Sequence, residues 1–189
     1  MKKYLLTAIL ILSVLMTVTG CSGGGTAPVL TLGEKEVALG DCTPGNFDSV
    51  DLEIGVPGGG IPIGNIPGNS WLSGFLTAGK DYNTYAYLYV YNPDRDEVPY
   101  FMSKVYKVDL HFDSEDQTFW EDGSILVNGI NFSGMDVSAV KEAMADYKLK
   151  TDDADHLFYK DGKYSYSIDF GEDGTITEVT LEEEISKSY

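Results

Sequence analysis

Apolar and polar residues alternate over several short stretches of the chain, most clearly from residue 84 to residue 91. Because successive side chains of a strand point to opposite faces, this stretch predicts a strand with two different faces. One face would carry tyrosines and the other small or aliphatic residues. The tyrosine face comprises Tyr85, Tyr87, Tyr89 and Tyr91, and the aliphatic face comprises Ala86, Leu88 and Val90.

The stretch from 104 to 112 alternates in the same way and predicts a second strand. We interpret His111 as a solvated residue of this strand rather than a catalytic group. The side chains expected to face inward are Tyr106, Val108, Leu110 and Phe112, and those expected to face outward are Lys107, Asp109 and His111.

Shorter alternating or apolar stretches predict further strands near 30–38, 71–76, 125–127, 157–160, 164–170 and 175–181. Gly33 divides the first of these into a hairpin, and Asp161-Gly162 is a favoured two-residue hairpin turn. The pattern of the last strand slips by one residue between Ile176 and Val179, which indicates a bulge. We expect the acidic tail at 182–184 to fray.

One helix is predicted over about 136–147, because four apolar side chains recur at helical spacing. Asp136 suits the N-cap position, and an alternative start at Ser133 would fit a capping box. The four apolar side chains are Val137, Val140, Met144 and Tyr147.

Several strands, joined by hairpins and accompanied by few helices, predict an α+β fold with antiparallel sheet. We expect the principal helix to pack on a C-terminal sheet that includes 164–170, with Val140 and Met144 buried against that sheet. The chain divides into a β-rich region at 30–124 and a region of helix and antiparallel hairpins at 125–189.

The segment from 55 to 69 holds six glycines and three prolines, a density that excludes an interior strand or a helix. It is therefore predicted to be a long loop. Its apolar side chains either tuck over the core, which is the commoner case, or form a contact surface. These side chains are Val56, Ile61, Ile63 and Ile66.

The N-terminus has the organisation of an export signal. Lys2 and Lys3 precede a mainly apolar run at 5–18, which as a helix would span about 21 Å, short of the ~30 Å hydrocarbon core of a membrane. This run therefore reads as part of a signal peptide, residues 1–20. Val18-Thr19-Gly20-Cys21 resembles the lipobox of bacterial lipoproteins. The alternative is ordinary secretion with cleavage at the same place.

The lipobox resemblance implies that Cys21 carries a diacylglyceryl group and becomes the first residue of the mature chain. Two or more acyl chains hold a protein stably on a membrane. Residues 21–29 then form the lipidated cysteine and a flexible tether. The implied location is the cell membrane or the outer membrane, outside the cytoplasm.

The charge of the chain is strongly negative, with 13 basic against 30 acidic residues. Without the leader lysines, 11 basic residues remain, and 11 minus 30 gives a formal charge of −19. This balance argues against nucleic acid as a partner, and against binding of anionic lipid through charge. It favours solubility and loose association with divalent cations.

Candidate chemistry is sparse, and no cofactor is predicted. Cys42 is the one cysteine besides Cys21, so it cannot form an internal disulfide, and we expect it to be a buried apolar residue. Pairing it as a nucleophile with His111 or His156 has no local support. Two histidines and one cysteine also make a zinc site improbable.

Two acidic stretches allow weak surface binding of calcium, but neither completes a calcium loop. The loop glycine is absent from both, and solvated acidic loops are the better interpretation. These stretches are Asn92, Asp94 and Asp96, and Asp152, Asp153 and Asp155.

The segment Gly134-Met135-Asp136-Val137-Ser138-Ala139-Val140, followed by tyrosine-rich hairpins and Phe170-Gly171-Glu172-Asp173-Gly174, resembles a known module. It is similar, over about 125–182, to small lipoproteins of the BamE (SmpA/OmlA) type and to β-lactamase-inhibitor-protein-like repeats. The resemblance implies an extracytoplasmic protein-interaction module with a three-stranded antiparallel sheet on a helical layer. The chain departs from it at Ala145-Asp146-Tyr147, where the family has Gly-x-Pro.

These observations favour a non-enzymatic, membrane-anchored lipoprotein that binds an unknown envelope or extracellular protein. The candidate partner-binding residues are Tyr85, Tyr87, Tyr89 and Tyr91, although a tyrosine face of this kind is more often covered by the 55–69 loop or the helix. The alternatives are a small hydrolase of envelope polymers with acidic catalysts, and an envelope-assembly or inhibitor role. Paired carboxylates in a cleft would favour the enzyme, and a flat tyrosine-bearing face would favour binding.

Overall fold

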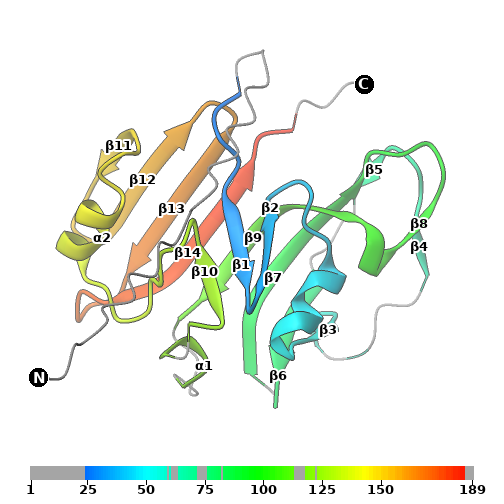
Figure 1. The fold of residues 1–189 in the computed structure, drawn as a ribbon, viewed down its shortest axis with the longest axis horizontal. Helices are drawn as coiled ribbons and strands as arrows, with labels where there is room; N and C mark the ends of the chain where they lie inside the picture. Colours follow the sequence, from blue (N-terminus) through cyan, green and yellow to red (C-terminus); the bar gives the residue numbers. More distant parts are fainter. Residues whose placement is uncertain are drawn as a thin grey trace, which may run out of the picture.

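The computed structural model describes residues 24–58, 60, 64–71, 76–81, 83–112, 118–121 and 123–185. Its main element is a large antiparallel sheet that runs through both halves of the chain (Figure 1). From one edge to the other, its strands are β11 (Leu149–Asp152), β12 (His156–Asp161), β13 (Tyr164–Phe170), β14 (Ile176–Glu183), β9 (Lys104–His111), β7 (Asn83–Asn92), β6 (Leu76–Lys80) and β3 (Glu53–Gly55). A short strand, β5 (Ser70–Trp71), also pairs with β7.

The large sheet consists of two meanders joined along β9 and β14. Strands β3, β6, β7 and β9 are neighbours in the order of the sequence, with the short strands β4, β5 and β8 between them in the chain, and β11 to β14 follow one another directly. The last strand of the chain returns to the centre, where Val179 pairs with Leu110 and Leu181 pairs with Val108. The regions predicted at 30–124 and 125–189 therefore share one continuous sheet.

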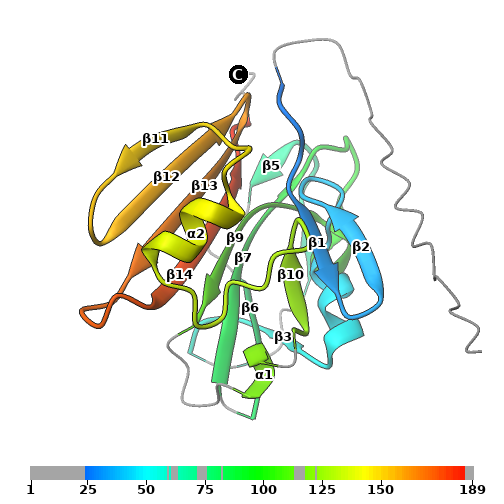
Figure 2. The ribbon, with the colours of Figure 1, turned by 60° about the vertical axis from the view of Figure 1, so that its left-hand side comes forward.

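A second layer covers one side of the large sheet (Figure 2). Over the N-terminal meander it consists of a small antiparallel sheet and a 3-10 helix, and over the C-terminal meander it consists of α2 (Val137–Ala143). The small sheet has the order β10 (Ile125–Val127), β1 (Val29–Leu32) and β2 (Lys35–Ala38), and the 3-10 helix is η1 (Pro44–Val50). The core lies between the layers and includes Leu30, Phe47, Leu88, Val108, Val140, Met144 and Ile168.

The prediction of an α+β fold with one principal helix is wrong, because the protein is mostly antiparallel sheet with short helices. Helix α2 begins after Asp136, whose carboxylate accepts a hydrogen bond from the Ala139 amide at 2.8 Å, as predicted for this cap. It ends at Ala143, with Met144 as the C-cap residue, rather than at Tyr147. Tyr147 instead packs its ring on Tyr166, with ring centroids 5.1 Å apart, and the chain then enters β11.

Other predicted elements are confirmed. The hairpins around Gly33 and Asp161-Gly162 are present as β1–β2 and β12–β13. The register of β13 and β14 shifts where the slip between Ile176 and Val179 predicts a bulge. Val140 and Met144 are buried. The acidic tail does not fray at Glu183, which pairs with Tyr164 in the sheet and is 8% exposed.

The glycine- and proline-rich segment contains short paired pieces rather than a single loop. Asn65–Ile66 form β4, which pairs with β8 (Val98–Pro99). The buried Asn92 amide donates to the carbonyl oxygens of Ile66, Pro67 and Asp96 at 3.0, 3.2 and 2.7 Å, and so holds this segment to the next turn. Ile66 is buried and Val56 packs against the core, whereas Ile61 and Ile63 lie outside the described residues.

The remaining elements are short. They are α1 (Thr118–Glu121) and the 3-10 helix η2 (Tyr100–Met102). No helix within the described part of the chain has the length and apolar character needed to span a membrane.

Candidate functional site

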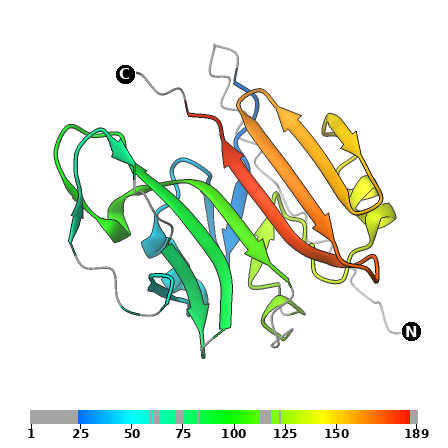
Figure 3. The same ribbon diagram turned by 180° about the vertical axis from the view of Figure 1, so that it is seen from behind.

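The second side of the large sheet is not covered by any described helix or strand (Figure 3). We call this side the open face. Its side chains come from alternate positions of the strands, and most of them are half-buried rather than buried. One cross-strand row of the open face runs through Phe158, Ser167, Thr180, Asp109, Tyr87 and Thr77.

Three of the four predicted tyrosines lie on the open face, and the fourth does not. Tyr87, Tyr89 and Tyr91 are half-buried at alternating positions of β7. Tyr85 is 1% exposed, and its ring contacts Phe119 at a centroid distance of 4.2 Å. The prediction that all four tyrosines share a face is therefore wrong for Tyr85.

A β-bulge explains the displacement of Tyr85. Ala78 pairs with Ala86, but the next residue of β6, Gly79, pairs with Thr84, so β7 has one extra residue at this point. An extra residue breaks the alternation of side chains along the bulged strand. Tyr85 and Ala86 are consequently both buried, and Tyr85 joins the core beside Trp120.

A second bulge brings Tyr106 to the open face. Tyr89 pairs with Lys107 and Val90 pairs with Val105, so Tyr106 is the extra residue of β9. Its ring lies 6.3 Å from the Tyr89 ring and 6.0 Å from the Tyr91 ring, in edge-to-face geometry. The prediction that Tyr106 faces inward is therefore wrong, and the open face gains a ring.

Asp109 is the most deeply covered polar group of the open face, with 6% of the residue exposed. The Thr180 hydroxyl lies 2.7 Å from its Oδ1 atom, and the Lys107 ammonium lies 3.2 Å from the same atom. The Lys107 ammonium also lies 4.5 Å from the centre of the Tyr89 ring. Burial, with the charge of Asp109 and a hydrogen bond to it, raises the pKa of Tyr89 to about 12.

Thr180 lies between two carboxylates. Its hydroxyl oxygen is 2.7 Å from Asp109 Oδ1 and 3.1 Å from Glu178 Oε1. A hydroxyl group has one proton, so it can donate to only one of these oxygens at a time. Charge-assisted hydrogen bonds are the stronger kind, so the shorter contact marks Asp109 as the principal acceptor.

A row of ionisable groups crosses four strands next to this network. His156 pairs with Asp169, Asp169 with Glu178, and Glu178 with His111. The His156 Nδ1 atom lies 2.8 Å from Asp169 Oδ1, and His111 Nε2 lies 3.4 Å from Glu178 Oε2. The His111 ring meets the Tyr87 ring edge-on at 4.8 Å. The two carboxylates in the middle are thus each flanked by a histidine.

The open face combines aromatic rings, carboxylates and imidazoles that already contact one another. Such groups are held in place before a partner arrives, which lowers the entropic cost of association. Tyrosine rings are apolar with a polar hydroxyl group, so they also suit a surface that is partly solvated in the free protein and desolvated in a complex. The arrangement is therefore suited to binding a macromolecule.

The remaining predicted candidates lie elsewhere. Cys42 is fully buried in the core, and burial raises the pKa of its thiol to about 12, which disfavours the thiolate nucleophile. His111 and His156 belong to the open face, so the structure does not bring either one to Cys42. The signal peptide at 1–20 and the lipid-attachment residue Cys21 lie outside the described residues.

Neither acidic stretch forms a cluster of metal ligands in the described part of the chain. In the first, Asn92 Oδ1 accepts a hydrogen bond from the Asp94 amide at 3.0 Å. In the second, Asp152 pairs with Lys141 at 2.5 Å.

The contacts around Asp109 were not predicted. Asp109 and Thr180 are separated by 71 positions, and the pairing of β9 with β14 brings them together. The outward position of Asp109 follows from alternation, but its partner across the strands has no local signal in the sequence.

Comparisons of this chain with protein-family models, with curated proteins and with solved structures found no match.

Proposed function

We propose that this protein is a membrane-anchored extracytoplasmic lipoprotein that binds another protein of the cell envelope or its surroundings and is not an enzyme. The lipobox-like tetrapeptide ending in Cys21 supports the anchor and a location on the cell membrane or outer membrane. The open face supports the binding role, and the observation that carries it is the tyrosine group of β7 and β9. This group comprises Tyr87, Tyr89, Tyr91 and Tyr106.

The physical reason is the state of these rings in the free protein. They lie half-buried on a side of the sheet that no described element covers. Tyrosine is enriched at protein interfaces, where it contributes a large contact area at small conformational cost. Edge-to-face contacts with Tyr106 orient the rings of Tyr89 and Tyr91.

The test is in-cell crosslinking of the native lipoprotein, with the captured proteins identified by mass spectrometry. The variant Tyr87→Ser/Tyr89→Ser should lose the captured partner. The matched control is Tyr100→Ser, which removes a half-buried tyrosine of η2, away from the tyrosine group. Equal capture by both variants would contradict the proposed binding face.

The lipid anchor has a separate test. Intact-mass measurement of protein extracted from membranes should give a chain that starts at Cys21 and carries added acyl mass. The variant Cys21→Ser should remain unprocessed or be released. A chain that starts at residue 21 without added mass would contradict the anchor.

A second candidate, a small hydrolase of envelope polymers, is favoured by one observation. Asp109 and Glu178 both lie within hydrogen-bonding distance of the Thr180 hydroxyl, so two carboxylates are close together. The Asp109 side chain is only 8% exposed and is paired with Lys107, whereas Glu178 is 32% exposed. Hydrolysis of purified wall polymers that is abolished by Glu178→Gln would support the enzyme.

The resemblance over 125–182 supports a third candidate, an envelope-assembly or inhibitor role. Gly134 has φ +68° before the helix that starts after Asp136, in keeping with the family's glycine before its helix. The same crosslinking experiment separates this role, because the captured partner would be an assembly component or a hydrolase.

A further inference from the structure

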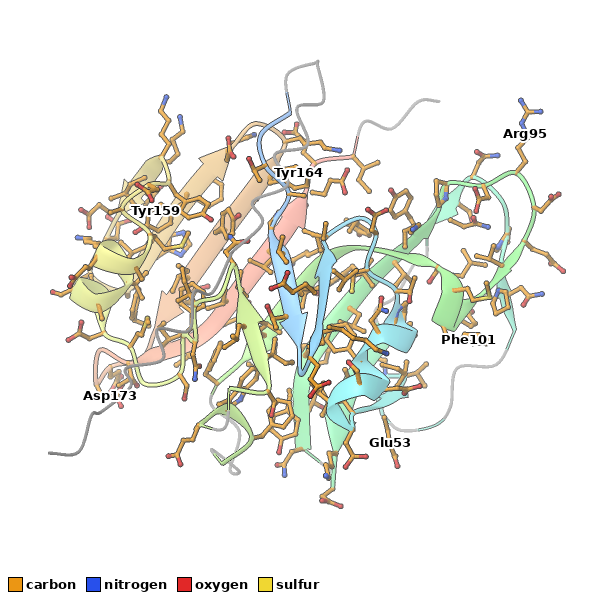
Figure 4. All side chains as sticks on the ribbon, in the orientation of Figure 1. Glu53, Arg95, Phe101, Tyr159, Tyr164 and Asp173 are labelled. Carbon is orange, nitrogen blue, oxygen red and sulfur yellow. The ribbon has the colours of Figure 1, made fainter. Side chains whose placement is uncertain are left out.

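Strand β11 forms one edge of the large sheet, and β3 forms the other. Tyr159, which pairs with Leu149 of β11, and Glu53 of β3 mark the two edges in Figure 4. Among the strands that the structure describes, only β12 pairs with β11, so the outer side of β11 has no described strand beside it. An edge strand presents backbone N–H and C=O groups with which a further strand can pair.

A bulge lies in the middle of β11. Leu149 pairs with Tyr159 and Thr151 pairs with Phe158, so Lys150 is the extra residue. An extra residue breaks the alternation of side chains along the bulged strand. The bulge therefore changes which residues of β11 share a face.

Residues at equal distances from the centre of the bulge face the same way. Leu149 packs against the core, and Asp152 pairs with a lysine of α2, so both lie on the covered side of the sheet. Lys148 and Asp153 lie on the side of the open face, because each is opposite an open-face residue of β12. Regular alternation would instead place Leu149 and Asp152 on opposite faces.

The backbone of β11 has the same symmetry. The Lys148 carbonyl accepts a hydrogen bond from β12 at 3.1 Å, and the Asp153 amide donates one to β12 at 2.9 Å. Backbone groups alternate in direction along an antiparallel strand, so those of Leu149 and Asp152 point away from β12. They point toward the outer side of the edge.

Charges change sign along β11. Lys148 and Lys150 precede Asp152 and Asp153. Acidic residues of the neighbouring turns offset the lysines in the net charge of this end of the sheet, so the order of the charges matters rather than their sum. Contact with Lys148, followed by its charge, lowers the pKa of Lys150. Within the described part of the chain, neither Lys148 nor Asp153 takes part in an ion pair.

We propose that β11 pairs antiparallel with β11 of a second copy of this chain, so that Leu149 of each copy lies opposite Asp152 of the other. In this register the outward backbone groups of these two residues meet and exchange hydrogen bonds. Both strands carry an extra residue at the centre, so the two bulges match, and side chains of the same face lie opposite each other. Bulges and lysines discourage the pairing of an edge strand with unrelated strands. A second copy meets both conditions.

The same register is favourable for the charges. Lys148 of each copy lies opposite Asp153 of the other, and two-fold symmetry repeats this pair. Opposite charges that face each other across antiparallel strands stabilise their pairing. Each lysine thus meets a carboxylate that has no ion pair in the single chain.

The dimer joins the two large sheets into one. A two-fold axis perpendicular to the sheet keeps both open faces on the same side, so the two tyrosine groups are presented together. Two linked binding faces can engage a partner with several copies of its own site more tightly than one face. The pairing involves neither the lipid anchor nor the tyrosine group, so it fails or holds independently of the proposed function.

The test is disulfide crosslinking in cells that co-express two tagged forms of the full chain, Lys148→Cys and Asp153→Cys. A disulfide needs Cα atoms about 4.4–6.8 Å apart, and opposed residues of antiparallel strands are about 4.5–5.5 Å apart. Mild oxidation should therefore link the two forms. Either form expressed alone should give no dimer, because its two cysteines are five positions apart along the ladder, about 16 Å. The matched control is Lys35→Cys, exposed on β2, co-expressed with Asp153→Cys, which should stay unlinked.

Absence of the link between Lys148→Cys and Asp153→Cys would overturn the proposal, as would equal linking by Lys35→Cys. A strand of another protein on the β11 edge would give the first of these results, because the two cysteines would then not meet. Links formed by either form alone would show a different register and would also overturn it.

A charge exchange tests the same register without cysteines. Lys148 and Asp153 are exposed, so their substitution leaves the core intact. Lys148→Glu places like charges opposite each other twice in a dimer and should raise the dimer dissociation constant about tenfold. Lys148→Glu/Asp153→Lys restores opposite charges and should recover the wild-type constant. Sedimentation equilibrium of the protein in one detergent compares the three, and equal constants, or no recovery in the double variant, would contradict the pairing.

Discussion

The hydroxyl of Thr180 should contribute substantially to stability, because it donates to a carboxylate that is almost fully covered. Thr180→Val keeps the shape and β-branching of the side chain and removes only this donor. The contact with Asp109 is 2.7 Å long, and the Asp109 side chain is 8% exposed. A hydrogen bond to a charged group contributes about 1.5–3 kcal/mol, so we expect this decrease in the free energy of unfolding. For a chain of this size it corresponds to a fall in melting temperature of about 3–12 °C.

Urea unfolding of the protein measures this change through its midpoint, with the slope unchanged. The matched control is Thr151→Val, at the β11 edge of the same cross-strand row, which should change stability by less than about 0.5 kcal/mol. A double-mutant cycle with Asp109→Asn should give a coupling energy of about 0.5–3 kcal/mol. If Thr180→Val matched its control, or if the cycle gave no coupling, our interpretation of the Asp109 contact would be wrong.

Three further predictions follow from burial. Met144→Ala should lower the free energy of unfolding by about 2–5 kcal/mol, because Met144 is 1% exposed. The control Met102→Ala, at a position that is 58% exposed, should have little effect on the free energy of unfolding, and urea unfolding compares the two variants. The fold raises the pKa of Tyr89 to about 12 and also raises the pKa values of Tyr91 and Tyr106, so the folded state favours their neutral form. The contribution of these tyrosines to the free energy of unfolding should be complete below about pH 10, where tyrosine of the unfolded chain stays neutral. It should be lost as the pH rises through about 12. Absorbance at 295 nm and unfolding midpoints against pH test this sign, and a stability that increases above pH 10 would contradict it. In Cys21→Ser, the remaining thiol of Cys42 should react with Ellman's reagent at pH 8 only after unfolding, because burial raises its pKa to about 12; rapid reaction of the native chain would refute this.

Local patterns were sufficient to predict most strands and turns. The Asp161-Gly162 turn has a sequence preference that depends on its own two residues, and the β12–β13 hairpin follows from it. The slip between Ile176 and Val179 was also a local signal, and a bulge is present there. Such features could be predicted because neighbouring residues determine them.

The extent of the helix could not be predicted in this way. Tyr147 lies at the correct spacing for the helical face, yet its ring packs on Tyr166 and its hydroxyl accepts a hydrogen bond from Asn128 at 2.7 Å. These contacts come from distant strands and turns, and they lie beyond the C-cap of α2 at Met144. The sheet, rather than helical periodicity, therefore determines where the helix stops.

The candidate site depends on contacts between residues that are distant in the sequence, and local sequence patterns do not indicate these contacts. Its network forms where the last strand of the chain pairs with β9, and Asp109 and Thr180 are 71 positions apart. The two bulges at Tyr85 and Tyr106 depend on the register of partner strands, so simple alternation assigns both rings to the wrong face. Alternation does predict Tyr87, Tyr89 and Tyr91 correctly, because the bulge opposite Tyr89 and Val90 adds its extra residue to β9 and leaves the alternation along β7 intact.

The bulge at Tyr85 allows two tyrosines of one strand to be compared directly. Tyr85→Ala removes a ring that is 1% exposed and packed in tilted contact with Phe119, and truncation of a buried aromatic residue typically costs about 3–5 kcal/mol. Tyr87→Ala removes a half-buried ring of the open face, with an edge contact to His111 that contributes about 0.5–1.5 kcal/mol. Melting temperature and partner capture should therefore respond in opposite ways: Tyr85→Ala should mainly lose stability, and Tyr87→Ala should mainly lose capture. Similar losses of stability in both variants would mean that the open face is covered in the native protein, and the tyrosine group would then belong to a core rather than to a binding surface.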